Sequence, residues 1–112
     1  MRLFDTKRQS LQEFQPLQPG HASIYVCGPT VQSAPHIGHL RSALIYDLLR
    51  RWMTYRGLEV TLVRNVTDIE DRTLSNAEAA GVPWGALAYP VAREFDPASA
   101  ALGLLPPPSD PP

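Results

Sequence analysis

Apolar and polar residues follow one another along this chain in a pattern that predicts an α/β fold. Residues 23–27 form a short, β-branched, apolar run that is typical of a buried strand, and residues 59–66 predict a second one. Between them, apolar residues recur at helical spacing over residues 37–56. A strand, a helix and a strand in this order predict a βαβ unit with parallel strands and a right-handed crossover.

The predicted helix over residues 37–56 has one broad apolar face, which we expect to face the core. Its members are Leu40, Leu44, Ile45, Leu48, Leu49, Trp52 and Met53. The polar residues Arg41, Asp47, Arg50 and Arg51 fall elsewhere around the helix. This pattern favours a solvated face for Arg50 and Arg51. Gly57 stands where a glycine in the left-handed conformation commonly ends a helix.

The segments on either side of this unit give weaker signals. Residues 3–16 predict a short, irregular antiparallel start to the chain. Thr67 and Glu70 fit a capping box for a further helix over residues 68–80, which Gly81 would end.

Two prolines interrupt the apolar pattern of the last third. Pro83 can begin a helix, but Pro90 and Pro97 would each remove one backbone hydrogen bond. Each would cost about 3 kcal/mol within a continuous helix. We therefore predict a broken element, in which Asp96 caps a new short helix that ends at Gly103.

Length and composition limit how the chain is organised. Its 112 residues suffice for one small domain, which we expect over residues 1–105. Residues 106–112 are mostly proline and predict an extended, disordered tail. We expect this tail to be a linker and not a docking peptide, because no aromatic or basic residues accompany the prolines.

Charge and hydropathy narrow the classes of function. The formal net charge of −1 gives no overall attraction to nucleic acid or membranes, so any RNA contact must be local. No apolar run approaches the roughly 18–20 residues that a membrane span requires. The first five residues of the chain include an acid, Asp5, at a point where a signal peptide would be apolar. We therefore expect a cytoplasmic protein.

Residues that could bind a ligand lie at the carboxyl ends of both predicted strands. Cys27 and Gly28 lie at the end of the first strand, and Asn65 and Thr67 lie at the end of the second. A pair of histidines opens the helix between them. Because ligands of parallel sheets bind beyond the carboxyl ends of the strands, we expect these residues to share one crevice.

The histidine pair, His36 and His39, suits a phosphate group. Both residues lie on one face of the first helical turn, where free backbone amides and the positive end of the helix dipole favour an anion. Gly38 between them would let a ligand approach the backbone closely. The alternative, which the residues leave open, is that both histidines are ordinary surface or core residues.

Cys27 has two interpretations, a thiolate that works at the crevice or a thiol that is simply buried. As the single cysteine of the chain it excludes an internal disulfide. A zinc site needs about four ligands, and the remaining histidine, His21, lies at the far side of the strand. We therefore expect that the chain cannot complete a zinc site by itself.

Acidic and basic clusters are less specific. Asp68, Glu70 and Asp71 could bind Mg²⁺, although Glu70 and Asp71 better suit a helix N-terminus. Arg41 and Arg64 could contact the phosphates of an RNA.

Three ordered motifs resemble the amino-terminal part of cysteinyl-tRNA synthetase. They are Ile-Tyr-Val-Cys-Gly-Pro-Thr-Val at residues 24–31, Pro-His-Ile-Gly-His-Leu-Arg-Ser at residues 35–42 and Val-Arg-Asn-Val-Thr-Asp-Ile-Glu-Asp at residues 63–71. The resemblance spans nearly the whole chain. It implies a partial Rossmann-like core of the class I synthetase, HUP-type fold. The ligase that joins cysteine to an amino sugar in the mycothiol pathway is a close relative, although Arg41-Ser42 is more similar to the tRNA synthetase.

The resemblance also implies a reaction and the residues that carry it. In this family ATP, with Mg²⁺, activates cysteine, which then passes to tRNA(Cys). Cys27 would bind a zinc ion that selects the cysteine thiol, and Gly28, Asn65 and Thr67 would seat the amino acid. The ATP-binding residues would be Thr30, His36, Gly38 and His39, and the two histidines would stabilise the charge on the α-phosphate.

Parts of the family's site have no counterpart in this sequence. The remaining zinc ligands, the Lys-Met-Ser-Lys-Ser loop and the anticodon-binding helices are absent from the 112 residues. We therefore expect a truncated fragment that is inactive alone. A non-catalytic nucleotide- or partner-binding module, and a fragment of the mycothiol-pathway ligase, stay open as alternatives.

Overall fold

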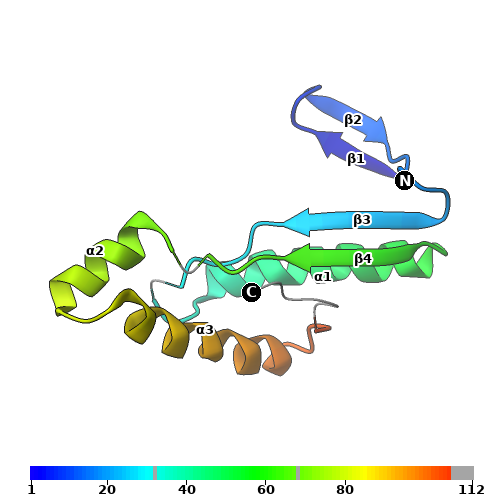
Figure 1. Cartoon of the computed structure of the whole chain (residues 1–112). Coiled ribbons are helices and arrows are strands. Elements are labelled where there is room, and N and C mark those ends of the chain that lie inside the picture. The colour runs from blue at the N-terminus through cyan, green and yellow to red at the C-terminus, as the bar shows by residue number, and fades with distance from the viewer. Residues whose placement is uncertain (32, 68, 107–112) are drawn as a thin grey trace.

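The computed structural model describes residues 1–31, 33–67 and 69–106 of the chain. Its elements follow in the order β1 (Arg2–Asp5), β2 (Ser10–Glu13), β3 (His21–Val26), α1 (Ile37–Tyr55), β4 (Glu59–Arg64), α2 (Asp71–Ala80) and α3 (Trp84–Ala101) (Figure 1). β3 and β4 pair in parallel, from His21 opposite Glu59 to Val26 opposite Arg64. The helix α1 connects them, so the predicted α/β class with a parallel βαβ unit is confirmed.

The helices α1, α2 and α3 connect to the strands through a chain of contacts. α1 packs against β4, and α3 packs against both α1 and α2. Buried apolar side chains of Val31, Ala88 and Phe95 form a cluster between the loop after β3 and the helix α3. This packing fixes the start of α1 close to the strand ends.

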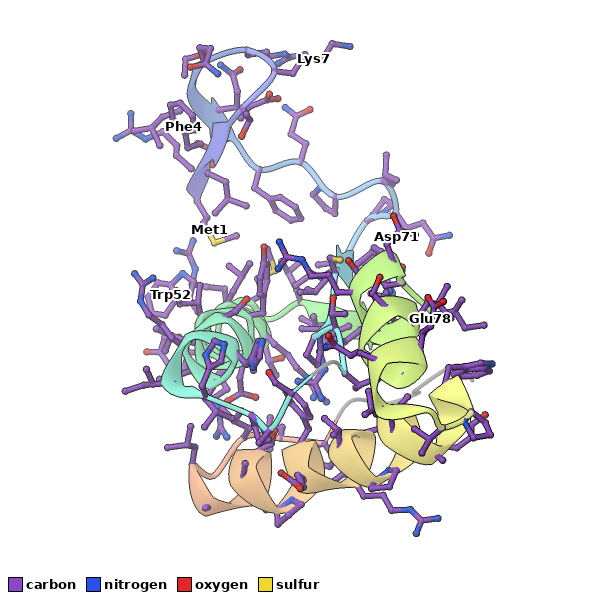
Figure 2. All side chains as sticks on the ribbon, turned by 90° about the vertical axis from the view of Figure 1, so that its left-hand side faces the viewer. Met1, Phe4, Lys7, Trp52, Asp71 and Glu78 are labelled. Atoms are coloured by element: carbon purple, nitrogen blue, oxygen red, sulfur yellow. The ribbon has the colours of Figure 1, made fainter. Side chains whose placement is uncertain are left out.

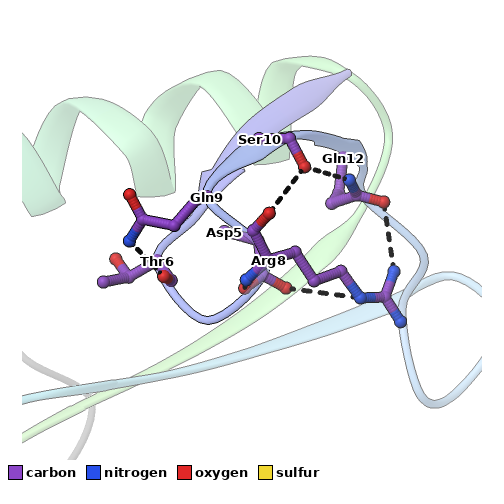
Figure 3. Close-up of polar contacts among 6 residues, drawn as sticks. All are labelled: Asp5, Thr6, Arg8, Gln9, Ser10 and Gln12. Carbon is purple, nitrogen blue, oxygen red and sulfur yellow. Dashed lines mark hydrogen bonds and ion pairs between the residues drawn. The ribbon is translucent and has the colours of Figure 1, made fainter.

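The strands β1 and β2 form an antiparallel hairpin that stands apart from the other elements (Figures 1 and 2). Side chains close its loop, since the Asp5 carboxylate accepts from the Arg8 amide at 2.9 Å and Arg8 donates to Gln12 at 3.1 Å (Figure 3). The predicted antiparallel start is confirmed, although it is a regular hairpin. Phe4 and Leu11 lie opposite each other and both stay more than half exposed.

The helix α3 corrects the prediction of a broken element. It runs without interruption from Trp84 to Ala101 with Pro90 and Pro97 inside it. Ala88 and Phe95, seven residues apart, share the buried face of this helix. Burial of such side chains stabilises the continuous helix by an amount similar to the cost of a proline. The expected end is confirmed, because Gly103 has a φ of 67° directly after the helix.

The start of α2 also differs from the prediction. The helix begins at Asp71, and the carboxylate of its N-cap, Glu70, accepts from the amide of Arg72 at 3.1 Å. The Thr67–Glu70 capping box is wrong because both backbone groups of Thr67 are used elsewhere: its amide donates to Pro29 and its carbonyl accepts from Val31. Gly81 ends the helix in the left-handed conformation, as expected. Asp68 lies outside the described residues.

The apolar face of α1 is only partly buried. Leu44, Leu48 and Trp52 are 46%, 66% and 46% exposed, and Figure 2 shows Trp52 on the outer side of the helix. The buried residues of α1 are Met53, as expected, and Asp47. Helical spacing identified an apolar face, but the packing of α1 against β4 and α3 buries only part of it. Gly57 follows the helix with a φ of 87°, as expected.

Asp47, Arg50 and Arg51 form hydrogen bonds to the segment after α3, which the predicted solvated face did not include; Arg51 is exposed, as predicted, and Arg50 is half-buried. Asp47 accepts from Arg51 Nε at 2.7 Å and from the amide of Leu105 at 3.1 Å. Arg51 also donates to the Gly103 carbonyl at 2.8 Å, and Arg50 donates to the Pro106 carbonyl at 2.9 Å. Except for Pro106, the predicted disordered tail lies outside the described residues.

Candidate functional site

The carboxyl ends of β3 and β4, the start of α1 and the helix α3 enclose a crevice of about 150 Å³. Its walls include residues from each of these elements: Cys27, Gly28, Gly38, His39, Arg64 and Phe95. Sites that enclose a whole small ligand are usually larger, at roughly 300–1,000 Å³. The crevice therefore suits a part of a nucleotide or an amino acid.

Gly28 and Asn65 tie the two strand ends together. The amide of Gly28 donates to the side-chain oxygen of Asn65 at 2.8 Å, and the side-chain nitrogen of Asn65 donates to the Thr67 hydroxyl at 3.3 Å. A Cβ atom at position 28 would lie 1.6 Å from the backbone oxygen of Asn65, so only glycine fits. Sequence reasoning expected these three residues at one crevice, and the structure brings them together.

The parallel pairing continues for a few residues beyond the strands. Thr30 and Thr67 form an isolated parallel bridge. The amide of Val31 donates to the carbonyl of Thr67 at 3.1 Å, and the amide of Thr67 donates to the carbonyl of Pro29 at 3.1 Å. These bonds fix the loop that leads from β3 into α1 against the loop that follows β4. The backbone of Thr30 therefore lies at the same rim as Gly28.

The two histidines cap α1 and stack on each other. His36 is the N-cap residue, and its Nδ1 accepts from the amide of Gly38 at 3.1 Å. The amide of His36 in turn points to His39 Nδ1 at 3.4 Å, and the ring centroids are 3.7 Å apart. Because each Nδ1 accepts, each neutral ring carries its proton on Nε2, where it can donate to a ligand.

This arrangement changes the predicted phosphate site in one respect. The amide of Gly38, expected to be open to an anion, is already bonded to the ring of His36. A Cβ atom on Gly38 would lie 3.0 Å from that ring, so the glycine is needed for the cap itself. A phosphate would meet the two Nε2–H groups, or would reach the Gly38 amide only after the ring of His36 turned away.

His39 is half-buried and its environment favours the neutral ring. Its ring centroid lies 5.4 Å from that of Phe95, a crevice residue that the sequence analysis did not identify. Desolvation by burial, followed by the neighbouring His36, lowers the pKa of His39 below its ordinary value of 6.5. At neutral pH His39 is therefore a hydrogen-bond donor without a positive charge.

Acidification is expected to destabilise the folded chain through His39. Because folding lowers the pKa of His39, the unfolded chain takes up more protons than the folded chain once the pH falls through about 6.5. The stabilisation is complete above that pH and is lost below it. The midpoint of urea unfolding should fall from neutral to mildly acidic pH, and it should fall less in the His39→Gln variant. Identical pH profiles for the two proteins would contradict this assignment.

The donor set around Cys27 does not make a complete metal site. Cys27 is a free, exposed thiol at the crevice. Among residues 1–31, 33–67 and 69–106, no group of three or more His, Cys, Asp or Glu could hold a metal ion. His21 lies at the other end of β3, as expected, and its ring pairs with the hydroxyl of Thr61 at 3.1 Å. The Glu70 carboxylate serves as the N-cap of α2.

In the described part of the chain, none of the helices is long and apolar enough to cross a membrane.

Comparison with known proteins identifies close relatives of this chain. The family model of tRNA synthetases class I (C) catalytic domain matches residues 13–112. Cysteine–tRNA ligase of Clavibacter sepedonicus is 64% identical over 116 residues, which cover 99% of this chain and 24% of that protein. The corresponding ligase of Streptomyces coelicolor is 52% identical over 111 residues, 99% of this chain and 18% of that protein. The chain thus spans about a quarter or less of these curated relatives.

A solved structure confirms the fold. Mycobacterium tuberculosis methionyl-tRNA synthetase in complex with methionyl-adenylate matches with a TM-score of 0.69 and 24% identity. The match covers 80% of this chain and 18% of that one. At this identity the likeness is one of fold, and it agrees with the Rossmann-like class expected from the sequence.

Proposed function

Because this chain belongs to the class I tRNA synthetase (C) catalytic-domain family, we propose that it forms part of the active site of a cysteine–tRNA ligase. The substrates would be ATP, cysteine and tRNA(Cys). The observation that carries the proposal is the tied rim of Gly28, Asn65 and Thr67 beside the stacked histidines. In this proposal the rim would hold the amino acid, and the histidines would bind the phosphates of ATP.

In this proposal the rim of the crevice holds the amino acid. Gly28 lets the substrate approach the backbone, because it has no side chain at the point where the two strand ends meet. Asn65 and Thr67 are fixed by their mutual hydrogen bond, and the Thr67 hydroxyl, which accepts in that bond, would still be able to donate its own proton to a ligand. A site whose polar groups are held in advance orders its substrate without reorganising.

The histidines would act on ATP, together with Thr30 and Gly38 at the start of α1. Because the Nδ1 atoms of His36 and His39 accept from backbone amides, their Nε2–H groups would be the donors to phosphate oxygens. Attack of the cysteine carboxylate on the α-phosphate adds negative charge to these oxygens, and the donors would stabilise that charge. The reaction needs no protein nucleophile. Mg²⁺ would accompany ATP as its counter-ion, and we assign it no ligand on this chain.

Cys27 would supply one thiolate to a zinc ion whose other ligands lie outside this chain. Zinc bound there would recognise the thiol of the substrate, which is a better ligand than the hydroxyl of serine. The described residues do not provide a complete donor set for such an ion.

The 112-residue chain is accordingly expected to retain no stoichiometric zinc. A single thiolate binds zinc weakly, since structural and catalytic sites use three or four protein ligands. The zinc content after dialysis, measured by plasma mass spectrometry, should be far below one ion per chain. One zinc per chain that disappears in the Cys27→Ser variant would contradict this expectation.

Calorimetry with ATP tests the proposed function in the chain itself. We expect weak ATP binding by the wild type and a loss of about tenfold or more in affinity in the His36→Ala variant, because a phosphate donor is removed. His21→Ala is the matched control, since His21 lies at the opposite end of β3. Equal affinities of the two variants, or no binding by the wild type, would count against a nucleotide site.

A further inference from the structure

Arg64 lines the crevice, but the roles proposed above for the histidines and for the rim do not involve it. It is the last residue of β4 and lies opposite Val26 in the sheet. Its aliphatic stem packs beside Gly28, since a Cβ atom on that glycine would lie 3.1 Å from Arg64 Cγ. Arg64 therefore reaches the crevice from the strand end that the Asn65 bond ties to β3.

The guanidinium of Arg64 lacks a partner among the residues that the structure describes. Its Nε is shielded from solvent and makes no hydrogen bond there, and no described acid pairs with it. Arg51 shows the usual alternative, with its Nε bonded to Asp47 at 2.7 Å. A buried N–H group without an acceptor destabilises a protein, so such a group calls for an explanation.

The electrostatics of the crevice add a second argument. At neutral pH His39 is uncharged, because burial lowers its pKa. Asp47, the acid among the lining residues, is already bonded to Arg51 and to the Leu105 amide. Arg64 is therefore a permanent positive charge in a partly desolvated crevice, and such a charge attracts oxyanions.

We propose that Arg64 is an anion-binding residue, which donates from its guanidinium to a carboxylate or phosphate oxygen of a ligand in the crevice. Planar guanidinium groups bind such oxyanions through two parallel hydrogen bonds. The inference rests on the proposed function for the identity of the ligand. The two sources of the oxyanion are the carboxylate of the amino acid and a phosphate of the nucleotide.

Matched ligand pairs distinguish these two sources. Calorimetry would compare AMP with adenosine and cysteine with cysteamine, on the wild type and on Arg64→Met. In Arg64→Met we expect the affinity for AMP or for cysteine to fall by about tenfold or more. The affinity for the matched ligand without the oxyanion, adenosine or cysteamine, should not change. Arg93→Met, which removes an exposed arginine on α3 outside the crevice, is the control. Arg64→Lys should restore affinity only in part, because lysine cannot form the paired bonds.

Thermal unfolding supplies a second measurement for the case in which these ligands bind too weakly for calorimetry. Inorganic phosphate, compared with chloride at equal ionic strength, should raise the unfolding midpoint of the wild type and of Arg93→Met more than that of Arg64→Met. An equal response of all three proteins, including no response, would overturn the proposal. Loss of ATP binding in His36→Ala together with unchanged Arg64→Met would refute this inference and leave the proposed function intact. If the chain bound no ATP but phosphate still stabilised it through Arg64, this inference would be supported and the proposed function would be contradicted.

Discussion

Replacing Gly28 by alanine is expected to destabilise the folded chain by about 3 kcal/mol or more. The new Cβ atom would lie 1.6 Å from the backbone oxygen of Asn65, a distance that the backbone can relieve only by separating the two strand ends. The hydrogen bond from the Gly28 amide to Asn65 would then be lost as well. Urea unfolding, followed by circular dichroism, measures the free-energy change.

Gly85→Ala is the matched control for this substitution. Gly85 lies in α3, and its new Cβ atom would meet only the ring of Tyr89, at 3.0 Å, which can turn aside. Alanine in a helix is also favoured over glycine by about 1 kcal/mol. We therefore expect little change or a small gain in stability. Equal destabilisation by the two substitutions would contradict the close approach of the strand ends.

The second large effect is expected at Asp47. Asp47→Ala removes the acceptor of the Leu105 amide, which holds the segment after α3 on α1, and the partner of Arg51, which itself donates to Gly103 of that segment. Bonds to a charged group contribute about 1.5–3 kcal/mol each when buried, and the half-exposed Arg51 reduces the ion pair's share. We expect a loss of about 2–3 kcal/mol in the free energy of unfolding.

Two further variants separate the parts of this effect. Asp47→Asn keeps an oxygen for the Leu105 amide and should recover part of the stability. Asp96→Ala removes an exposed aspartate from α3 and should change the stability by less than about 0.5 kcal/mol. If Asp47→Ala proved as mild as Asp96→Ala, the bonds between α1 and the segment 103–106 would not contribute to stability.

The sequence predicted the parts of the fold that local patterns determine. The short apolar runs of β3 and β4, and the glycines at positions 57, 81 and 103, defined the parallel unit and the ends of the helices. Because the carboxyl ends of parallel strands meet at one edge, the sequence also predicted that Gly28 would meet Asn65 and Thr67. These features depend on short-range geometry or on a single topological rule.

The wrong predictions concern features that tertiary packing decides. Helix propensity excluded Pro90 and Pro97 from a continuous α3, but the helix runs through both prolines and buries Ala88 and Phe95 on one face. The predicted solvated face of Arg50 and Arg51 did not include their bonds to carbonyl groups of a segment some fifty residues away, although Arg51 is exposed as predicted. No local signal in the sequence indicates either contact.

Tertiary packing also decides how much of the apolar face of α1 is buried. Helical spacing correctly grouped Leu44, Leu48 and Trp52 on one apolar face, but their exposed fractions in the described structure are 46%, 66% and 46%. The chain spans about a quarter of the cysteine–tRNA ligases that it resembles.

The most direct test of the proposed function uses a chimeric enzyme. In it, this chain replaces the matching segment of the Clavibacter sepedonicus cysteine–tRNA ligase, which is 64% identical. We predict cysteine-dependent ATP–pyrophosphate exchange within about tenfold of the unmodified ligase, and its loss when His36 and His39 are both replaced by alanine. A folded chimera without exchange, or one whose exchange survives the double replacement, would contradict the proposal that this crevice activates cysteine.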